Sequence, residues 1–174
     1  MRGTAINTMY YAGTVTLSLL IGNEKKLPVA KIQNAGTSSL FNFFTDCLVG
    51  DFELAKNARP TKIRLLRVTR DPTTQEVVET KSESHFIYLL TRPEKIYSST
   101  EQGESVRYSF VIPRTLLDSA SFNRIGLYSD GASGVEDFSA YCDVSFEDGS
   151  LPSWGSSSVL TVDWELNISN KPKA

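Results

Sequence analysis

Residues 160–168 read LTVDWELNI, and the alternation within this stretch decides the fold class. Apolar residues occupy every second position, with polar residues between them: Leu160, Val162, Trp164, Leu166 and Ile168. Successive side chains of a strand point to opposite faces, so this pattern predicts a strand with one buried side.

Three segments with the same period of two precede this strand. They are residues 105–112, residues 122–129 (FNRIGLYS) and residues 138–146. Proline at position 113 ends the first, and Asp-Gly or Ser-Gly pairs supply turns between the others. The last third of the chain is therefore predicted to be a succession of antiparallel strands.

Apolar runs in the first half of the chain predict further strands over 10–21, 29–33, 61–69, 75–80 and 85–91. The run 85–91 is apolar on both sides and is predicted to lie at a sheet centre, and 75–80 is predicted to be a polar edge strand. About nine short strands separated by turns predict an all-β fold, an antiparallel β-sandwich of jelly-roll-like or Ig-like type.

Residues 38–49 break the strand period and predict one short helix. Its apolar residues recur at spacings of three and four: Leu40, Phe43, Phe44, Cys47 and Leu48. Thr37 or Ser38 is expected to cap its first turn and Gly50 to end it. We expect the apolar stripe to cover one open end of the sandwich and residues 51–60 to form a linker.

The composition indicates one globular domain over residues 1–174, with short flexible arms at 1–9 and 170–174. Hydrophobic residues make up 40% and charged residues 22%, which is ordinary for such a domain. Lys plus Arg number 18 against 20 for Asp plus Glu, so no basic excess favours nucleic acid as a partner. The sequence predicts neither a signal peptide nor a membrane helix, so we expect synthesis in a cytoplasm.

Catalytic and cofactor motifs are not found in the sequence. The single histidine, His85, has no serine or cysteine nucleophile motif to serve, so we expect a non-enzymatic protein with no cofactor. Cys47 and Cys142 are predicted to be small buried thiols, with a disulfide between them as the alternative. Zinc is not expected, because these residues lack ligand spacing.

Acidic residues gather in the loops of the C-terminal third: Asp130, Glu136, Asp137, Asp143, Glu147 and Asp148. Carboxylates from loops are the ligands that Ca²⁺ prefers, so a calcium site is one interpretation. Asp-Gly pairs are also ordinary turn residues, and the spacing matches no EF-hand loop. We favour solvated turns without a metal.

Four aromatic residues are candidates for an interface or a ligand platform. Tyr10 and Tyr11 follow the N-terminal arm, Tyr128 ends one strand, and Trp154 lies in the loop 151–156. A tryptophan or tyrosine combines a large apolar area with a polar group, which suits either a sugar platform or a subunit contact.

The C-terminal third resembles tailed-bacteriophage virion structural proteins of the tail-fibre, baseplate and collar type. The pattern consists of FNRIGLYS at 122–129, an alanine-containing strand at 139–144 (SAYCDV) and LTVDWELNI at 160–168, and NAGT at 34–37 adds to it. The resemblance implies a structural building block located in the virion, with copies of itself and other virion proteins as partners. No long fibrous repeat accompanies it, which favours a compact subunit. The alternative is a carbohydrate- or receptor-binding module that uses Trp154 and Tyr128.

Overall fold

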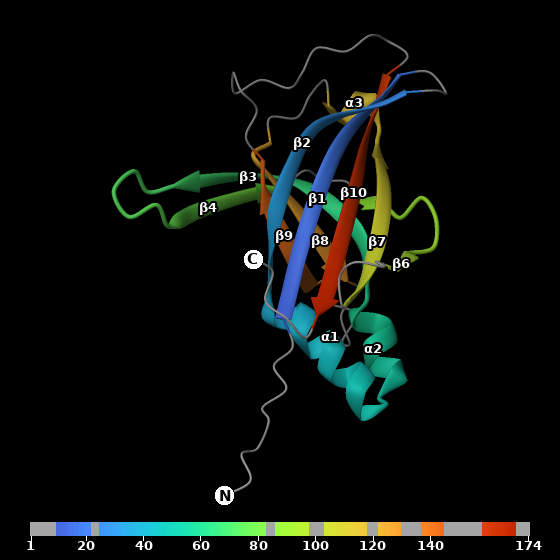
Figure 1. The fold of residues 1–174 in the computed structure, drawn as a ribbon. Coiled ribbons are helices and arrows are strands. Elements are labelled where there is room, and N and C mark those ends of the chain that lie inside the picture. The colour runs from blue at the N-terminus through green and yellow to red at the C-terminus, as the bar shows by residue number, and fades with distance from the viewer. Residues whose placement is uncertain are drawn as a thin grey trace, which may run out of the picture.

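The computed structural model describes residues 10–21, 25–82, 86–97, 103–117, 122–129, 137–144 and 158–169 (Figure 1). Its strands are β1 (Tyr10–Ile21), β2 (Lys25–Gly36), β3 (Pro60–Arg70), β4 (Val77–Ser82), β5 (Ile87–Tyr88), β6 (Glu94–Tyr97), β7 (Gly103–Ile112), β8 (Arg124–Ser129), β9 (Asp137–Asp143) and β10 (Ser158–Ser169). Its helices are α1 (Ser38–Val49), α2 (Phe52–Ala58) and α3 (Arg114–Leu117). The predicted arms at 1–9 and 170–174 lie outside the described residues.

The strands form one ten-stranded antiparallel sheet in the order β4-β3-β8-β9-β2-β1-β10-β7-β6, with β5 paired to β3. The sheet is not closed, since β4 and β6 lie at its two ends. β2 pairs with β1 along most of its length and with β9 at Ala35 and Gly36, which joins the two halves. The prediction of a mostly β, antiparallel fold is thus confirmed.

The core lies between the two halves of this bent sheet, and β8 and β9 cross behind β1 and β10 in Figure 1. β10 lies between β1 and β7, where Trp164 is opposite Val15 and Tyr108. Leu160, Val162 and Trp164 have no exposed surface, and Leu166 is 3% exposed. These four residues of the face predicted from LTVDWELNI are therefore buried, and the side chain of Ile168 lies outside the described part of the structure. The other half contributes Ile63, Leu65, Ile125, Leu127, Ala140 and Cys142.

β3 and β4 form a hairpin that extends away from the rest of the sheet (Figure 1). Its turn is closed by Asp71, whose carboxylate accepts hydrogen bonds of 2.8 Å from the N–H groups of Thr73 and Thr74. These bonds stabilise the ionised form and lower the pKa of Asp71. The edge strand predicted over 75–80 is confirmed, since β4 lies at one end of the sheet.

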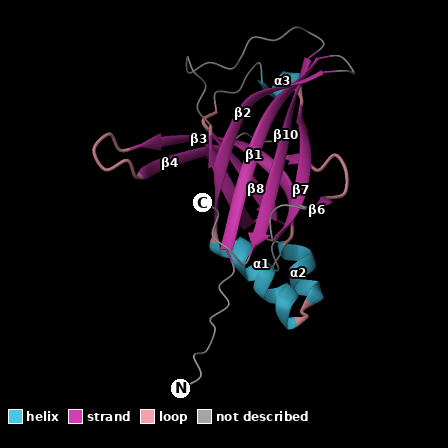
Figure 2. Cartoon of the chain, in the orientation of Figure 1, coloured by secondary structure: helices cyan, strands magenta, loops and turns pink. Residues whose placement is uncertain are grey.

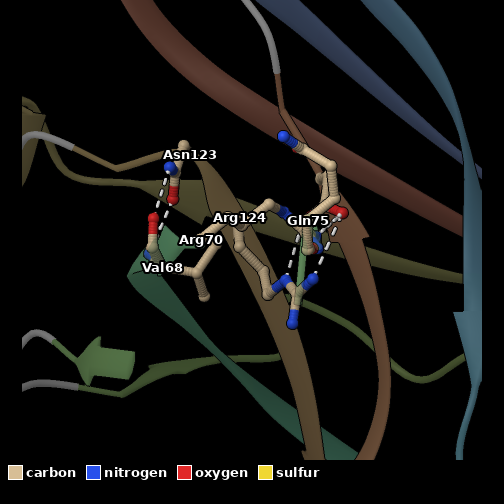
Figure 3. Close-up of polar contacts among 6 residues, drawn as sticks. Val68, Arg70, Gln75, Asn123 and Arg124 are labelled. Atoms are coloured by element: carbon tan, nitrogen blue, oxygen red, sulfur yellow. Dashed lines mark hydrogen bonds and ion pairs between the residues drawn. The ribbon is translucent and has the colours of Figure 1, made fainter. Parts of the chain in front are cut away.

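The side chain of Asn123 continues the pairing between β3 and β8 (Figure 3). Its Oδ1 accepts from the N–H of Val68 at 2.8 Å, and its Nδ2 donates to the Val68 carbonyl at 2.9 Å. Nearby, Arg70 donates to the backbone carbonyl of Gln75 at 2.8 Å. An amide side chain thus replaces a backbone partner just before β8 begins.

The apolar run predicted as a central strand over 85–91 forms only the two-residue strand β5, so that prediction is wrong. Leu89 donates from its N–H to the carbonyl of Thr61 at 3.1 Å, and Leu90 does the same to Ser109 at 3.1 Å. The segment therefore crosses from β3 toward β7 instead of continuing along the sheet. Tyr88 and Leu90 are each 64% exposed.

Three further elements differ from the sequence prediction. Residues 52–58, predicted as part of a linker, form α2, whose Ala55 is buried. β2 is longer than the predicted 29–33, and β6 was not predicted. No helix within the described ranges has the length and apolarity needed to cross a membrane.

Candidate functional site

Helices α1 and α2 lie together at one end of the sheet (Figure 2). Thr37, which precedes α1, donates from its Oγ1 and its N–H to the carbonyl of Ser139 in β9, at 2.7 and 3.0 Å. These bonds anchor the start of the helix to the sheet. The sequence had predicted a side-chain cap by Thr37 or Ser38, but the first turn has no side-chain cap hydrogen bond, so that prediction is wrong. Gly50 ends α1 with a φ of 80°, a conformation that glycine adopts easily, which confirms the predicted stop.

The inner face of α1 packs on the core only through the first half of the helix. Leu40 has no exposed surface, and Phe43 and Phe44 pack against the core cluster with ring centroids 5.5 Å apart. Cys47 and Leu48 were predicted to continue this buried stripe, but both are exposed. The prediction fails there because the second half of α1 runs beyond the end of the sheet (Figure 2).

The same end of the molecule carries four exposed apolar side chains, which we term the apolar patch. Their exposed fractions are 52% for Phe41, 76% for Leu48, 73% for Val49 and 72% for Phe52. Phe41 and Leu48 are about two helical turns apart and share one side of α1. Val49 and Phe52 flank the turn at Gly50. The patch is thus a local concentration of apolar surface on consecutive helices.

A cavity of about 750 Å³ lies beside the apolar patch, between the two helices, the start of β3 and the segment 89–93. Phe43, Phe52, Leu89 and Tyr108 form its apolar walls. Burial raises the pKa of Tyr108 to about 12, although the positive charge of Arg59 acts in the opposite direction. Phe52 belongs both to the cavity wall and to the patch.

The charged residues that line the cavity are all cations. Lys56, Arg59 and Arg92 line it, and none of its lining residues is acidic. Within the described ranges these three cations make no ion pair. The Oγ1 of Thr61, also in the lining, is buried without a hydrogen-bond partner there. The cavity therefore offers positive charge beside aromatic walls.

A second group of aromatic residues surrounds Tyr128 on the outer face of β3 and β8. The centroids of the Tyr128 and Phe86 rings lie 5.4 Å apart in an edge-to-face arrangement, and those of the Tyr88 and Phe86 rings lie 6.5 Å apart. The Arg64 guanidinium and the Lys62 ammonium lie 3.6 and 4.2 Å from the centre of the Phe86 ring. The face of Phe86 is therefore occupied by cations, whereas Tyr88 is open to solvent.

The four aromatic residues predicted as candidates for an interface or a ligand platform come from separate parts of the chain. Tyr10 and Tyr11 begin β1, opposite Ser169 and Ile168 of β10. β9 and β2 separate β1 from the β8 strand that carries Tyr128. Trp154 lies outside the described residues, as does His85.

The two cysteines and Asp143 are the next residues that the sequence analysis singled out. Cys47 and Cys142 are both free, so the disulfide alternative is wrong, and only Cys142 is the buried thiol expected. Burial raises the pKa of Cys142 to about 12. The Asp143 carboxylate pairs with Arg124 at 2.7 Å and Arg70 at 2.8 Å.

The calcium hypothesis is only partly covered by the described residues. Among them, no group of three or more His, Cys, Asp or Glu side chains could hold a metal ion. Asp137 begins β9. Asp130, Glu136, Glu147 and Asp148 lie outside the described ranges.

Sequence reasoning missed the cavity because it missed α2. The segment FELAKNAR at 52–59 contains strong helix formers, with Glu53 in the first turn and Lys56 in the last, as the helix dipole favours. That signal was sufficient to predict a second helix. Its position against the segment 89–93 depends on tertiary packing, which no local pattern contains.

Comparison with known proteins gives no relative from which a function can be transferred. No protein-family model matches the chain. Neither a curated protein nor a solved structure matches it.

Proposed function

We propose that this protein is a non-enzymatic structural component of a tailed-phage virion, which assembles with copies of itself and with neighbouring virion proteins. The apolar patch is the observation that carries this proposal. Burying one large apolar side chain contributes about 1.5–3 kcal/mol. Four such side chains therefore offset much of the roughly 4–15 kcal/mol that association costs.

The resemblance of the C-terminal third to phage virion proteins supplies the kind of assembly. The two most distinctive parts of that pattern occupy β8 and β10, which lie in different halves of the bent sheet. Their inward side chains join one core cluster. We propose on this basis that the two halves act as the layers of a jelly-roll-like or Ig-like sandwich, a rigid body that presents the helical end to its partners.

The proposal is tested by counting copies of the protein in purified particles of the phage that encodes it. We expect a fixed stoichiometry by quantitative mass spectrometry. A Leu48→Ser/Val49→Ser variant should enter particles at least tenfold less well, while its melting temperature stays unchanged. Val78→Ser is the matched control, because Val78 is 63% exposed on β4, in the hairpin away from the helices (Figure 1). Absence of the protein from particles, or normal incorporation of the patch variant, contradicts the proposal.

Carbohydrate binding is the second candidate, favoured by the exposed ring of Tyr88 beside Phe86 and Tyr128. Aromatic rings with nearby hydrogen-bond donors suit the apolar faces of sugars. A glycan array should then show binding that Tyr88→Ala, Tyr128→Ala or Trp154→Ala weakens at least tenfold. The Leu48→Ser/Val49→Ser variant should bind the same glycans normally. An array without binding excludes this candidate.

A further inference from the structure

We propose that the cavity between α2 and the segment 89–93 binds an acidic segment of a partner protein, with a carboxylate on Arg59 and Arg92 and an apolar side chain between the aromatic walls. This inference rests on the proposed assembly function and names the chemistry of the partner.

The charge of the cavity selects an anion. Its three cations come from two separate segments: Lys56 and Arg59 from α2 and the residue after it, and Arg92 from the segment that crosses to β6. The carboxylates of the neighbouring elements do not line the cavity. Glu94 pairs with Arg107 at 3.7 Å, and Glu53 is exposed on α2. A guanidinium binds a carboxylate through two parallel hydrogen bonds, so Arg59 and Arg92 are suited to this group.

The walls of the cavity select an apolar group next to the anion. Phe43, Phe52 and Leu89 contribute ring and aliphatic surface, and the buried Tyr108 forms part of the wall near Arg59. Thr61 also lines the cavity, and its Oγ1 is buried without a hydrogen-bond partner within the described residues. The volume of about 750 Å³ lies in the range of roughly 300–1,000 Å³ that is typical of ligand sites.

The position of the cavity favours a protein segment over a small free ligand. Phe52 forms part of the cavity wall and is also 72% exposed as a member of the apolar patch. An occupant that fills the cavity can therefore continue over Phe52 onto Val49 and Leu48. A peptide chain has the length to contact both surfaces. A partner that buries the patch thus has a route for one of its acidic side chains into the cavity.

The test uses the full chain and an array of N-acetylated pentapeptide amides, each with two acidic and two apolar positions. A matched array replaces every Glu and Asp by Gln and Asn. We expect binding to acidic peptides, at least tenfold weaker binding to their neutral counterparts, and an equal loss in Arg59→Gln/Arg92→Gln. The control Arg67→Gln/Lys81→Gln removes the same charge from facing positions of the β3–β4 hairpin and should bind like the wild type.

Three outcomes overturn the inference. They are no peptide binding, binding that the neutral peptides share, and binding that the Arg59→Gln/Arg92→Gln variant retains. Titration with 3-phenylpropionate separates the two sources of a carboxylate, because saturation by this probe without any peptide binding would indicate a small free ligand.

Particle incorporation distinguishes the inference from the proposed function. Normal incorporation of Arg59→Gln/Arg92→Gln, together with reduced incorporation of Leu48→Ser/Val49→Ser, refutes the cavity site but supports the proposed assembly function. Normal incorporation of both variants refutes assembly through this end. Loss in both variants supports both proposals.

Discussion

Replacing Trp164 by phenylalanine and by alanine separates two opposite contributions of one side chain. Trp164 has no exposed surface and lies in β10 between β1 and β7. Its indole Nε1 is buried and has no hydrogen-bond partner among the described residues. An unpaired buried donor destabilises a fold by about 1–3 kcal/mol. Burial of the ring acts in the opposite direction.

The magnitudes of the two terms predict very different outcomes for the two variants. A tryptophan buries roughly 150–250 Å², and about 25 cal/mol per Å² then gives an upper limit of roughly 4–6 kcal/mol. Trp164→Ala should lower the free energy of unfolding by about 3–5 kcal/mol. Trp164→Phe loses about 1–2 kcal/mol of burial and packing, but it also removes the unpaired N–H. Its free energy of unfolding should stay within about 1 kcal/mol of the wild type.

Urea unfolding followed by far-ultraviolet circular dichroism measures both variants, because this signal does not depend on the removed indole. The slopes with denaturant should be equal, so that the midpoints report stability. A loss below about 1 kcal/mol in Trp164→Ala would mean that the side chain does not contribute to the core. If Trp164→Phe loses as much as Trp164→Ala, the N–H is satisfied and the reasoning about the unpaired donor is wrong.

Three further predictions concern stability. Leu40→Ala should lower the free energy of unfolding by about 2–5 kcal/mol, whereas Leu48→Ala should change it by less than about 0.5 kcal/mol; similar losses in urea unfolding would contradict the two faces assigned to α1. Asp143→Asn leaves Arg124, whose side chain is 10% exposed, without its charged partner. Urea unfolding should show a loss of about 1–3 kcal/mol, and no loss would mean that the pair is not formed. The pKa of Cys142 is raised from 9.0 to about 12, so between those values only the unfolded chain releases this proton and stability falls as the pH rises. Urea unfolding at pH 8, 9, 10 and 11 should show that the free energy of unfolding of Cys142→Ala falls less steeply with pH than that of the wild type, by up to about 1.4 kcal/mol per pH unit. Equal slopes for the two proteins would contradict the burial of Cys142.

The elements that the sequence predicted well have patterns that only one structure satisfies. The alternation in LTVDWELNI and the helical spacing over 38–49 each fit one kind of element, and the bounds of α1 agree with the prediction. The turn at Asp71 was predictable because its hydrogen bonds join residues close in sequence. Features of this kind can be predicted because the residues that form them are close together in the sequence.

Features that depend on distant residues could not be predicted in the same way. Arg124 is 8% exposed within β8, where a charged residue is unexpected. Its partner Asp143 faces it only because β8 and β9 pair in one particular register. The run 85–91 similarly has the composition of a central strand. Its course is set by hydrogen bonds to Thr61 and Ser109, which come from β3 and β7.

The error at Leu48 bears directly on the proposed function. Apolar residues at helical spacing indicate that a helix face is buried, but the pattern does not say whether the same chain or a partner buries it. Leu40 follows the pattern and lies in the core, whereas Leu48 follows it and is 76% exposed. The sequence therefore predicts burial of a helix face that the described residues of this chain leave exposed at Leu48. A partner that binds at α1 and α2 would bury this apolar face. The cationic cavity beside Phe52 would favour a partner with acidic residues at the contact.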